Sequence, residues 1–344
     1  MDVVQSLADH QANLDALQQI LDGKSVLISG ATGVVGLHIV FVLSHLVDRG
    51  AQIKATLVSK TGSTVPFPVP KNFESLMLDF SDQFALTEFE SQAETFDFVV
   101  HAAGYGQPNK FMSDPLKVIA LNSIGTNAMA RIARRSNGRF LFLSTSEIYT
   151  GVPGKPSELS SGASLPQHFR APYIEAKRIG ETITEVYRNE GLSACSARLA
   201  LAYGPGVKLD DGRVLNQFIM RALTEETLVL MDQGVAERCY VFAVDAAIAL
   251  LNILTRGEHS VYNIGGETVI TIRGLAEMIG DITDTGVEVP GKEIGVGVQA
   301  SPSNVSLDVS RYTSEFGDLE RTSIRDGLER TVGWYRGLLA ASTE

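Results

Sequence analysis

Short apolar runs alternate with longer runs of helical periodicity along the first half of the chain. The apolar runs predict buried strands over 25–29, 53–59, 75–79, 97–103, 139–145 and 193–199. Helices are expected between them, near 36–49, 82–94, 115–136 and 173–190. Strands this apolar, separated by helices, are typical of a parallel sheet that is buried on both faces. The pattern therefore predicts an α/β fold built on a doubly wound parallel sheet.

The pattern loosens after about residue 205. Helices are expected over 213–224, 243–256, 271–282 and 323–340, with a β-rich run at 260–266 and a glycine-rich stretch around 291–297. One amphipathic helix over 6–22 precedes the sheet and is expected to pack on its surface. We predict an N-terminal extension (1–22), a sheet domain (23–205 with about 239–264) and a smaller C-terminal substrate-binding lobe (206–238 and 265–344).

Composition narrows the possible partners. The chain has 344 residues and a net charge of −11, so neither a nucleic acid nor an anionic membrane is expected as a partner. The two cysteines, Cys195 and Cys239, are too few for a disulfide framework and lack metal-ligand spacing, so no metal site is expected. No apolar run reaches the roughly 18 residues of a membrane span. The polar N-terminus does not resemble a signal peptide, so a cytoplasmic protein is expected.

A glycine-rich turn, GATGVVG (30–36), joins the first predicted strand to a helix. Gly30 permits a tight turn, Gly33 lets the backbone approach a pyrophosphate, and Gly36 lets helix and strand pack closely. Free amides at the helix N-terminus suit phosphate oxygens, so the turn predicts a dinucleotide site. The second strand ends without the acid that binds the ribose hydroxyls of NAD. Ser59 and Lys60 stand there and would tolerate a 2′-phosphate, which leaves NAD and NADP open.

A tyrosine and a lysine in APYIEAKRIGE (171–181), Tyr173 and Lys177, are spaced to share one face of a helix. Upstream, a predicted strand runs into Thr145, Ser146 and Glu147. Parallel strands bring their carboxyl ends to the edge that carries the glycine turn, so these residues are expected beside the cofactor. An ammonium lowers the pKa of a neighbouring phenol. We expect Tyr173, helped by Lys177 and Thr145, to remove a hydroxyl proton while hydride leaves the adjacent carbon.

These motifs, in this order, resemble the extended short-chain dehydrogenase/reductases of the NAD-dependent nucleotide-sugar epimerase/dehydratase family. The resemblance covers about residues 24–320. The matching segments are GATGVVG (30–36), VVHAAG (99–104), PLKVIALNSIGT (115–126), STSEIY (144–149), YIEAK (173–177), ARLALAYGPG (197–206), DGRVLNQFI (211–219), ERCYVFAVDAA (237–247) and YNIGG (262–266).

The resemblance implies a Rossmann-type domain that binds NAD and a smaller lobe that binds a nucleoside diphosphate sugar, with a UDP-sugar favoured. It implies oxidation at sugar C4 by Thr145, Tyr173 and Lys177, with Glu147 and Ser146 as further catalytic candidates. The implied cofactor contacts are Gly30, Thr32, Gly33, Val34, Gly36, Ser59, Lys60, Asp79, Ala102, Ala103, Gly104, Asn122, Tyr173 and Lys177. The implied substrate contacts are Arg213, Arg238, Asn216 and Tyr203, while Asp245 is expected to hold structure.

The net reaction remains open at this point. Related 4,6-dehydratases carry an acid where this chain has Ser146, which disfavours dehydration. Thr-Ser-Glu at 145–147 resembles UDP-glucuronate decarboxylases, but Ala300 replaces their C-terminal arginine and Leu201 replaces an asparagine. Glu147 would also suit an epimerase, since a base beside a 4-ketone can remove an adjacent proton. Epimerisation and UDP-glucuronate-type decarboxylation therefore lead, with simple C4 dehydrogenation and 4,6-dehydration as alternatives.

A different class of protein, a non-catalytic NAD(P)-binding regulator, would share this fold. Such relatives generally lose the Tyr–Lys pair, which this chain keeps as Tyr173 and Lys177. The resemblance also implies a homodimer, in which the helices over 115–136 and 173–190 pair with those of a second copy. The sequence therefore favours a homodimeric enzyme.

Overall fold

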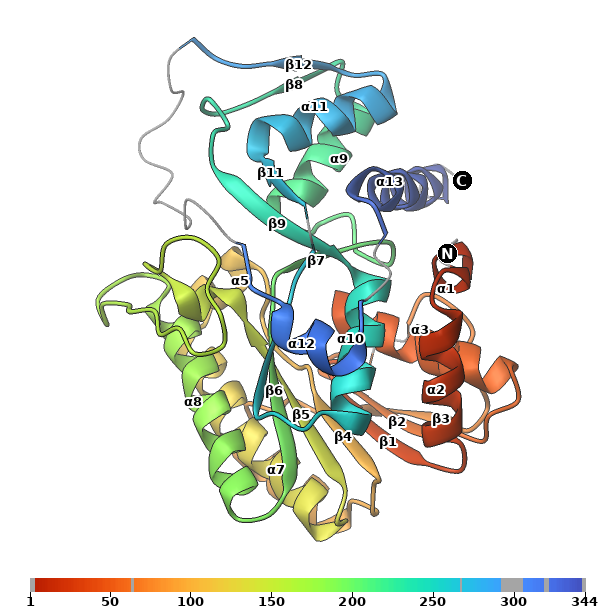
Figure 1. Cartoon of the computed structure of the whole chain (residues 1–344). Coiled ribbons are helices and arrows are strands. Elements are labelled where there is room, and N and C mark those ends of the chain that lie inside the picture. The colour runs from red at the N-terminus through yellow and green to blue at the C-terminus, as the bar shows by residue number, and fades with distance from the viewer. Residues whose placement is uncertain (1–3, 63–64, 267, 292–305, 319–321, 342–344) are drawn as a thin grey trace.

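The structure, a computed structural model, describes residues 4–62, 65–266, 268–291, 306–318 and 322–341. Its main sheet has seven parallel strands in the order β10-β6-β5-β4-β1-β2-β3 (Figure 1). This confirms the predicted α/β fold with a parallel sheet. The strands are β1 (Ser25–Ser29), β2 (Lys54–Ser59), β3 (Phe73–Met77), β4 (Phe98–His101), β5 (Arg139–Thr145), β6 (Ser193–Leu199) and β10 (Val261–Ile264).

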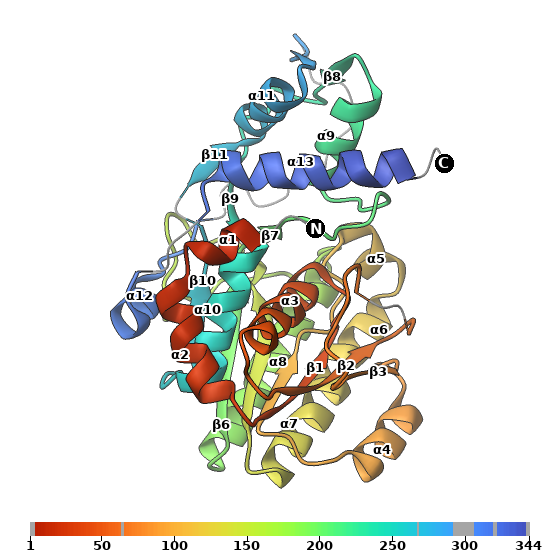
Figure 2. The same ribbon diagram turned by 90° about the vertical axis from the view of Figure 1, so that its right-hand side faces the viewer.

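Helices cover both faces of this sheet. α3 (Val34–Asp48), α10 (Ala243–Arg256) and α2 (Gln11–Leu21) lie on one side, and α4 (Gln83–Gln92), α6 (Pro115–Ala120), α7 (Thr126–Arg135) and α8 (Ala171–Asn189) lie on the other (Figures 1 and 2). A π-helical turn, η1 (Leu121–Gly125), joins α6 to α7. Central strands are apolar because both of their faces are covered: Val26, Leu27 and Ile28 of β1 are fully buried.

The remaining elements form a smaller assembly beside the carboxyl ends of these strands (Figure 1). It contains α9 (Val214–Thr224), α11 (Ile272–Thr283) and α13 (Ile324–Ala341), with α12 (Ser310–Phe316) beside β10. The strands of this assembly were not predicted from the sequence. They are β7 (Leu201–Tyr203), β8 (Thr227–Val229), β9 (Glu237–Phe242), β11 (Val269–Thr271) and β12 (Gly286–Glu288). β11, β9 and β7 form one small sheet, and β12 pairs with β8. The domain boundaries stay a prediction, and most of the glycine-rich stretch at 291–297 lies outside the described residues.

The N-terminal extension differs from its prediction. Instead of one helix over 6–22 there are two, α1 (Val4–Ala8) and α2, separated at Asp9 and His10. The break lets the buried His10 reach α10, where its Nε2 lies 2.9 Å from Oδ1 of Asp245. The Thr322 amide also donates to Asp245, over 2.6 Å. Asp245 thus joins the extension to the C-terminal segment, which agrees with the structural role expected for it.

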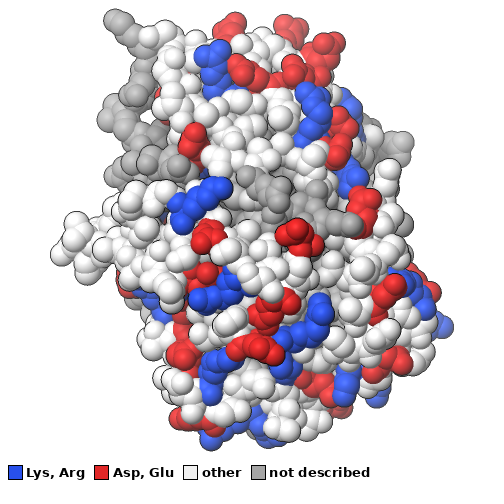
Figure 3. All heavy atoms as spheres, in the orientation of Figure 1, with Lys and Arg blue, Asp and Glu red and all other residues white. Residues whose placement is uncertain are grey.

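Acidic and basic side chains are interspersed on the face shown in Figure 3. Both cysteines are buried and free. Across the described ranges, no helix has the length and apolar character needed to cross a membrane, and no three His, Cys, Asp or Glu residues gather as a metal site. The expected cytoplasmic location and the expected absence of nucleic-acid and membrane partners stay predictions.

Two buried histidines should make the fold sensitive to acid. Burial lowers the pKa of His38 to about 4 and that of His101 to about 3, from 6.5. Unfolding restores the higher pKa, so the unfolded chain binds more protons below pH 6.5, and stability is lost as pH falls from 6.5 towards 4. The free energy of unfolding should drop by up to about 1.4 kcal/mol per group for each pH unit. Urea titrations across this range will measure the slope. His38→Asn should make the free energy of unfolding depend less on pH, while substitution of the exposed His259 should leave that dependence unchanged.

Candidate active site

The glycine turn has the geometry that its sequence predicts. Gly30 follows β1 with φ +71°, and a Cβ there would lie 2.6 Å from the Ala103 amide nitrogen. A Cβ on Gly36, in the first turn of α3, would lie 2.2 Å from the Gly30 carbonyl oxygen. The helix is capped by Gly33 without a side-chain hydrogen bond. First-turn amides are therefore not occupied by a capping side chain, and Thr32 and Val34 flank the position where a pyrophosphate would bind.

Other predicted cofactor residues meet at the same sheet edge. Ala102, Ala103 and Gly104 follow β4, which pairs in parallel with β1. Asn122 lies in the turn η1, fully buried, and its Nδ2 donates to the Val118 carbonyl over 2.8 Å. The Asn122 Oδ1 has no partner among the described residues. A buried acceptor in this state fits a ligand or a water molecule.

At the end of β2, the Lys60 ammonium already has partners. Its Nζ lies 2.9 Å from an oxygen of Asp79 and 2.9 Å from the Tyr105 hydroxyl. Asp79 is itself fixed by the Ser81 amide and hydroxyl, and its pKa lies below its usual value because these bonds and Lys60 outweigh the effect of burial. A 2′-phosphate would have to compete with the Asp79 carboxylate for Lys60. The arrangement therefore suits NAD better than NADP.

We expect Asp79→Asn to relax this preference. Removal of the carboxylate frees Lys60 to bind a 2′-phosphate and removes a negative charge that would repel that phosphate. The affinity for NADP should therefore rise about tenfold, while the affinity for NAD should change little. Fluorescence titration with both cofactors will measure the ratio of dissociation constants, with Glu74→Gln on the exposed face of β3 as the control. An unchanged ratio in Asp79→Asn would show that Asp79 does not govern the choice.

The Tyr–Lys helix brings the predicted catalytic group together. Tyr173 and Lys177 are buried on α8 beside the end of β5, where the Thr145 hydroxyl is close enough to Tyr173 to oppose the rise that burial causes in its pKa. Lys177 Nζ donates to the Leu143 carbonyl over 2.7 Å and lies 4.9 Å from the Phe142 ring centroid. A Cβ on Gly104 would be 3.4 Å from that Nζ. Thr145, Tyr173 and Lys177 thus meet at the edge that carries the glycine turn.

Burial controls the electrostatics of this group. Desolvation, and secondarily the charge of Glu147, raise the pKa of Tyr173, while the Thr145 hydrogen bond and the charges of Arg170 and Arg213 oppose them. Burial lowers the pKa of Lys177 to about 7. Among the groups of the chain itself, desolvation outweighs the nearby cations, so the pKa of the Tyr173 phenol is raised rather than lowered. The sequence expectation of a lowered pKa depends on a charge that the chain alone does not supply.

Glu147 and Ser146 begin a short 3₁₀ turn, η2 (Ser146–Tyr149), directly after β5. The Glu147 carboxylate bonds both Nε and Nη2 of Arg170, with the Nε bond at 2.9 Å. Arg170 precedes α8 and lies 5.2 Å from the Phe111 ring centroid, and Phe111 stacks on Tyr173 with centroids 4.6 Å apart. Sequence reasoning assigned no role to Arg170 or Phe111, although RAPY (170–173) places an arginine three residues before the tyrosine.

The predicted substrate residues are only partly brought together. Arg238 is half-buried on β9, where burial lowers its pKa and the charges of Arg170 and Glu147 both act on it. Arg213 forms two bonds to Asp211, of 2.9 and 2.8 Å. Asn216, on α9, is buried with its Oδ1 unpartnered among the described residues. Tyr240, which the sequence did not suggest, lies close enough to Arg238 and Arg213 for their charges to oppose the rise that burial causes in its pKa.

Tyr203 lies apart from the other predicted substrate residues, and its role as a substrate contact stays a prediction. It is buried in the core, where its hydroxyl donates to the Ile324 carbonyl over 3.3 Å. Its ring packs edge-on against Phe242, with centroids 5.6 Å apart. The residue therefore fastens β7 to the segment that begins α13. Ala300, the other departure noted in the sequence, lies outside the described residues.

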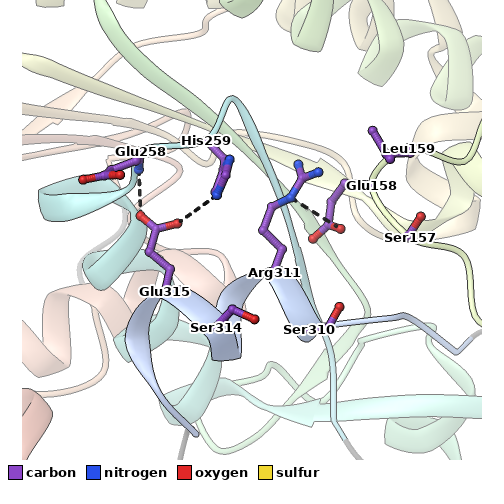
Figure 4. Close-up of a pocket in the computed structure, with 9 residues that line it drawn as sticks. All are labelled: Ser157, Glu158, Leu159, Glu258, His259, Ser310, Arg311, Ser314 and Glu315. Atoms are coloured by element: carbon purple, nitrogen blue, oxygen red, sulfur yellow. Dashed lines mark hydrogen bonds and ion pairs between the residues drawn. The ribbon is translucent and has the colours of Figure 1, made fainter.

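A cavity of about 440 Å³ lies apart from this group, between the loop at 157–159, the turn before β10 and α12 (Figure 4). Two side-chain pairs line it: Arg311 lies 3.8 Å from Glu158, and His259 lies 3.8 Å from Glu315. None of the predicted site residues lines it. The sheet edge therefore remains the candidate active site.

Fold and site together define a class: an α/β protein built to bind a dinucleotide beside a Thr–Tyr–Lys group. The model of the NAD dependent epimerase/dehydratase family matches residues 26–265, and the chain belongs to that family of enzymes. The family predicted from the sequence motifs is thus confirmed.

Relatives and solved structures agree with this assignment. UDP-glucuronic acid decarboxylase 2 of Arabidopsis thaliana is 28% identical over 91% of this chain and 68% of its own length. UDP-glucuronic acid decarboxylase 1 of Xenopus tropicalis is 27% identical over 92% of this chain and 73% of its own length. UDP-glucose 4-epimerase of Thermotoga maritima, solved with UDP-glucose, has a TM-score of 0.77 at 22% identity, over 92% of this chain and 99% of its own. A Bordetella bronchiseptica enzyme in complex with NAD⁺ has a TM-score of 0.75 at 24% identity, over 93% of this chain and 95% of its own.

Proposed function

We propose that the protein oxidises a UDP-sugar at C4 with NAD and decarboxylates UDP-glucuronate or a close analogue. The observation that carries the oxidation is the buried juxtaposition of Thr145, at the end of β5, with Tyr173 and Lys177 on α8, at the edge that carries the glycine turn. Glu147, with Arg170 and Arg238 around it, supports a substrate that carries an additional carboxylate. The decarboxylase relatives point the same way.

The residues suit such a cofactor and such a reaction. Gly30 and Gly33 would bring the backbone close to the pyrophosphate, Gly36 would let α3 pack against the turn, and Lys177 and Asn122 would hold the nicotinamide end. When bound, NAD takes up hydride and later returns it, and its oxidised ring adds a positive charge that favours the Tyr173 phenolate. Tyr173 accepts the C4 hydroxyl proton, and Thr145 orients that hydroxyl. A ketone at C4 turns the C5 carboxylate of a uronate into a β-keto acid. Its C–C bond can break with release of carbon dioxide, while Ser146 offers no acid for dehydration.

Mass spectrometry of the protein incubated with NAD and UDP-glucuronate tests this proposal. We expect loss of the mass of carbon dioxide from the sugar nucleotide. An unchanged mass would refute decarboxylation of this sugar. Proton NMR of the same sample would then show whether a new epimer has formed, which is the outcome expected if Glu147 serves an epimerase.

The active form is proposed to be a homodimer joined through α6, α7 and α8. Leu116, Ile119, Ile179 and Val186 are exposed apolar residues on these helices, with exposed fractions from 41% to 77%. A shallow cavity of about 350 Å³, mostly apolar, lies between α7 and α8 on the same side. Burying apolar side chains of this kind against a second copy would form a four-helix bundle.

We expect Ile179→Asp combined with Val186→Asp to separate the copies, because each buried carboxylate would lack a partner. Light scattering should report twice the mass of one chain for the wild type and one chain for the variant. Phe84→Asp, which alters an apolar residue on α4 that is 89% exposed, is the control. A monomeric wild-type protein would refute the dimer.

A further inference from the structure

The Glu147–Arg170 ion pair lies beside the reacting group, and none of the proposed proton or hydride transfers uses Arg170. We propose that Glu147 is a placeholder on Arg170: the carboxylate of a uronate substrate takes the place of the Glu147 carboxylate on this guanidinium, and a neutral sugar cannot. This inference rests on the proposed function, because it requires a substrate with a carboxylate. Arg170 would then be the specificity-determining residue of the site.

Arg170 is held in place independently of Glu147. Its backbone carbonyl accepts from the Tyr173 and Ile174 amides in the first turn of α8, both over 3.1 Å. Its side chain is only 9% exposed and lies over the Phe111 ring. A guanidinium supported by an aromatic face and a helix start will keep its position when its anionic partner changes.

Glu147 is held less completely. Its backbone is fixed at the start of η2, where its amide donates to the Thr145 hydroxyl over 3.3 Å. Within the described part of the chain, the side-chain bonds of its carboxylate are those to Arg170. The carboxylate can therefore leave by side-chain rotation alone. The charge of Arg238 already acts in this region, so a displaced Glu147 still has a cation nearby.

The balance of charge explains why a carboxylate is required. Removing the anion from a buried arginine is strongly unfavourable unless another anion replaces it. A uronate supplies that anion with the same planar, two-oxygen geometry, so the exchange leaves the number of ion pairs unchanged. A hydroxymethyl group supplies no charge and leaves Glu147 in place. Arg213 is a poorer site for this exchange, because its partner Asp211 also accepts from the Arg213 amide over 3.0 Å and from Gln107 Nε2 over 2.9 Å and is therefore fixed where Glu147 is not.

Binding measurements on four proteins test the exchange. All carry Tyr173→Phe to prevent turnover and are saturated with NAD; the first has no further change, and the others add Arg170→Met, Glu147→Gln or Arg131→Met. Arg131 forms a two-bond pair with Glu90 at the surface, both bonds at 2.6 Å, and is the matched control. Calorimetry gives the dissociation constants of UDP-glucuronate and UDP-glucose for each protein.

We expect Arg170→Met to raise the dissociation constant of UDP-glucuronate by about tenfold or more and to change that of UDP-glucose by less than about twofold. Glu147→Gln should lower the dissociation constant of UDP-glucuronate by about fivefold, because a neutral amide competes poorly with the substrate carboxylate for the guanidinium. The control should match the parent. A purely structural role for Arg170 would weaken both ligands equally, and that result would overturn the exchange. If Arg170→Met does not fold, Glu147→Gln still tests the exchange. Unchanged or weaker binding of UDP-glucuronate to Glu147→Gln would show that Glu147 does not compete with the substrate for Arg170.

Failure of the exchange is distinguishable from failure of the proposed function. If the parent protein binds both sugar nucleotides equally, the uronate substrate is wrong, and the exchange is rejected with it. If the parent prefers UDP-glucuronate and Arg170→Met keeps that preference, the proposal of a uronate substrate is retained and only the exchange on Arg170 is rejected.

Discussion

Tyr173→Phe should lower turnover by about a hundred-fold to ten-thousand-fold, the range lost when a general acid–base group is removed. The ring remains, so its stacking on Phe111 at 4.6 Å and the packing of α8 are preserved. Only the hydroxyl beside Thr145 is lost. NAD should therefore still bind with an affinity close to that of the wild type. Steady-state rates with the substrate found by mass spectrometry, together with cofactor titration, will measure both quantities.

Tyr149→Phe is the matched control for this variant. The Tyr149 hydroxyl bonds Asn263 over 2.8 Å and Arg198 over 2.7 Å, so it has a structural role close to the same strand end. Its loss should lower stability more than the rate constant. Full turnover in Tyr173→Phe would reject the assignment of the proton transfer. Absence of any turnover in the wild type, with NAD bound, would instead favour a regulatory protein.

The sequence located the parts of the site that depend on periodicity and strand order. Gly30 and Gly36 are required by close backbone contacts, so their spacing carries the geometry directly. Thr145 and Tyr173 meet because a parallel strand end and the helix that follows it return to one edge. These relations are encoded locally and by the alternation of strand and helix, which is why they could be predicted.

Pairings across irregular chain could not be predicted in the same way. The loop between η2 and α8 has no periodicity, so nothing in the spacing shows that Glu147 meets Arg170. Lys60 was interpreted as a candidate for a 2′-phosphate, but Asp79, from the next strand end, is paired with it. Tyr203 was assigned to the substrate from its motif, yet the three-residue strand β7 directs it into the core. Each case depends on a side-chain partner distant in sequence.

Lys177→Met should both weaken NAD binding and remove its dependence on pH. Because burial lowers the pKa of Lys177 to about 7, the ammonium is present below that pH and is lost as the pH rises through it. If this ammonium holds the nicotinamide ribose, the dissociation constant of NAD should rise by up to about tenfold per pH unit above 7 in the wild type. Methionine preserves the contact with Phe142 but cannot titrate, so its titration curve should be flat.

Turnover in this variant should also fall, by about a hundred-fold or more, because the charge that favours the phenolate is gone. Lys24→Met is the control, since Lys24 precedes β1 at the opposite edge of the sheet and pairs with Asp97 at 3.2 Å. Calorimetric titration with NAD from about pH 6 to about pH 9, a range that spans the lowered pKa, gives the dependence directly. A wild-type constant that does not change over this range would mean that the Lys177 ammonium makes no contact with the cofactor. Its effect on turnover would then have to come from Tyr173 alone, through the Leu143 carbonyl that positions the lysine beside the phenol.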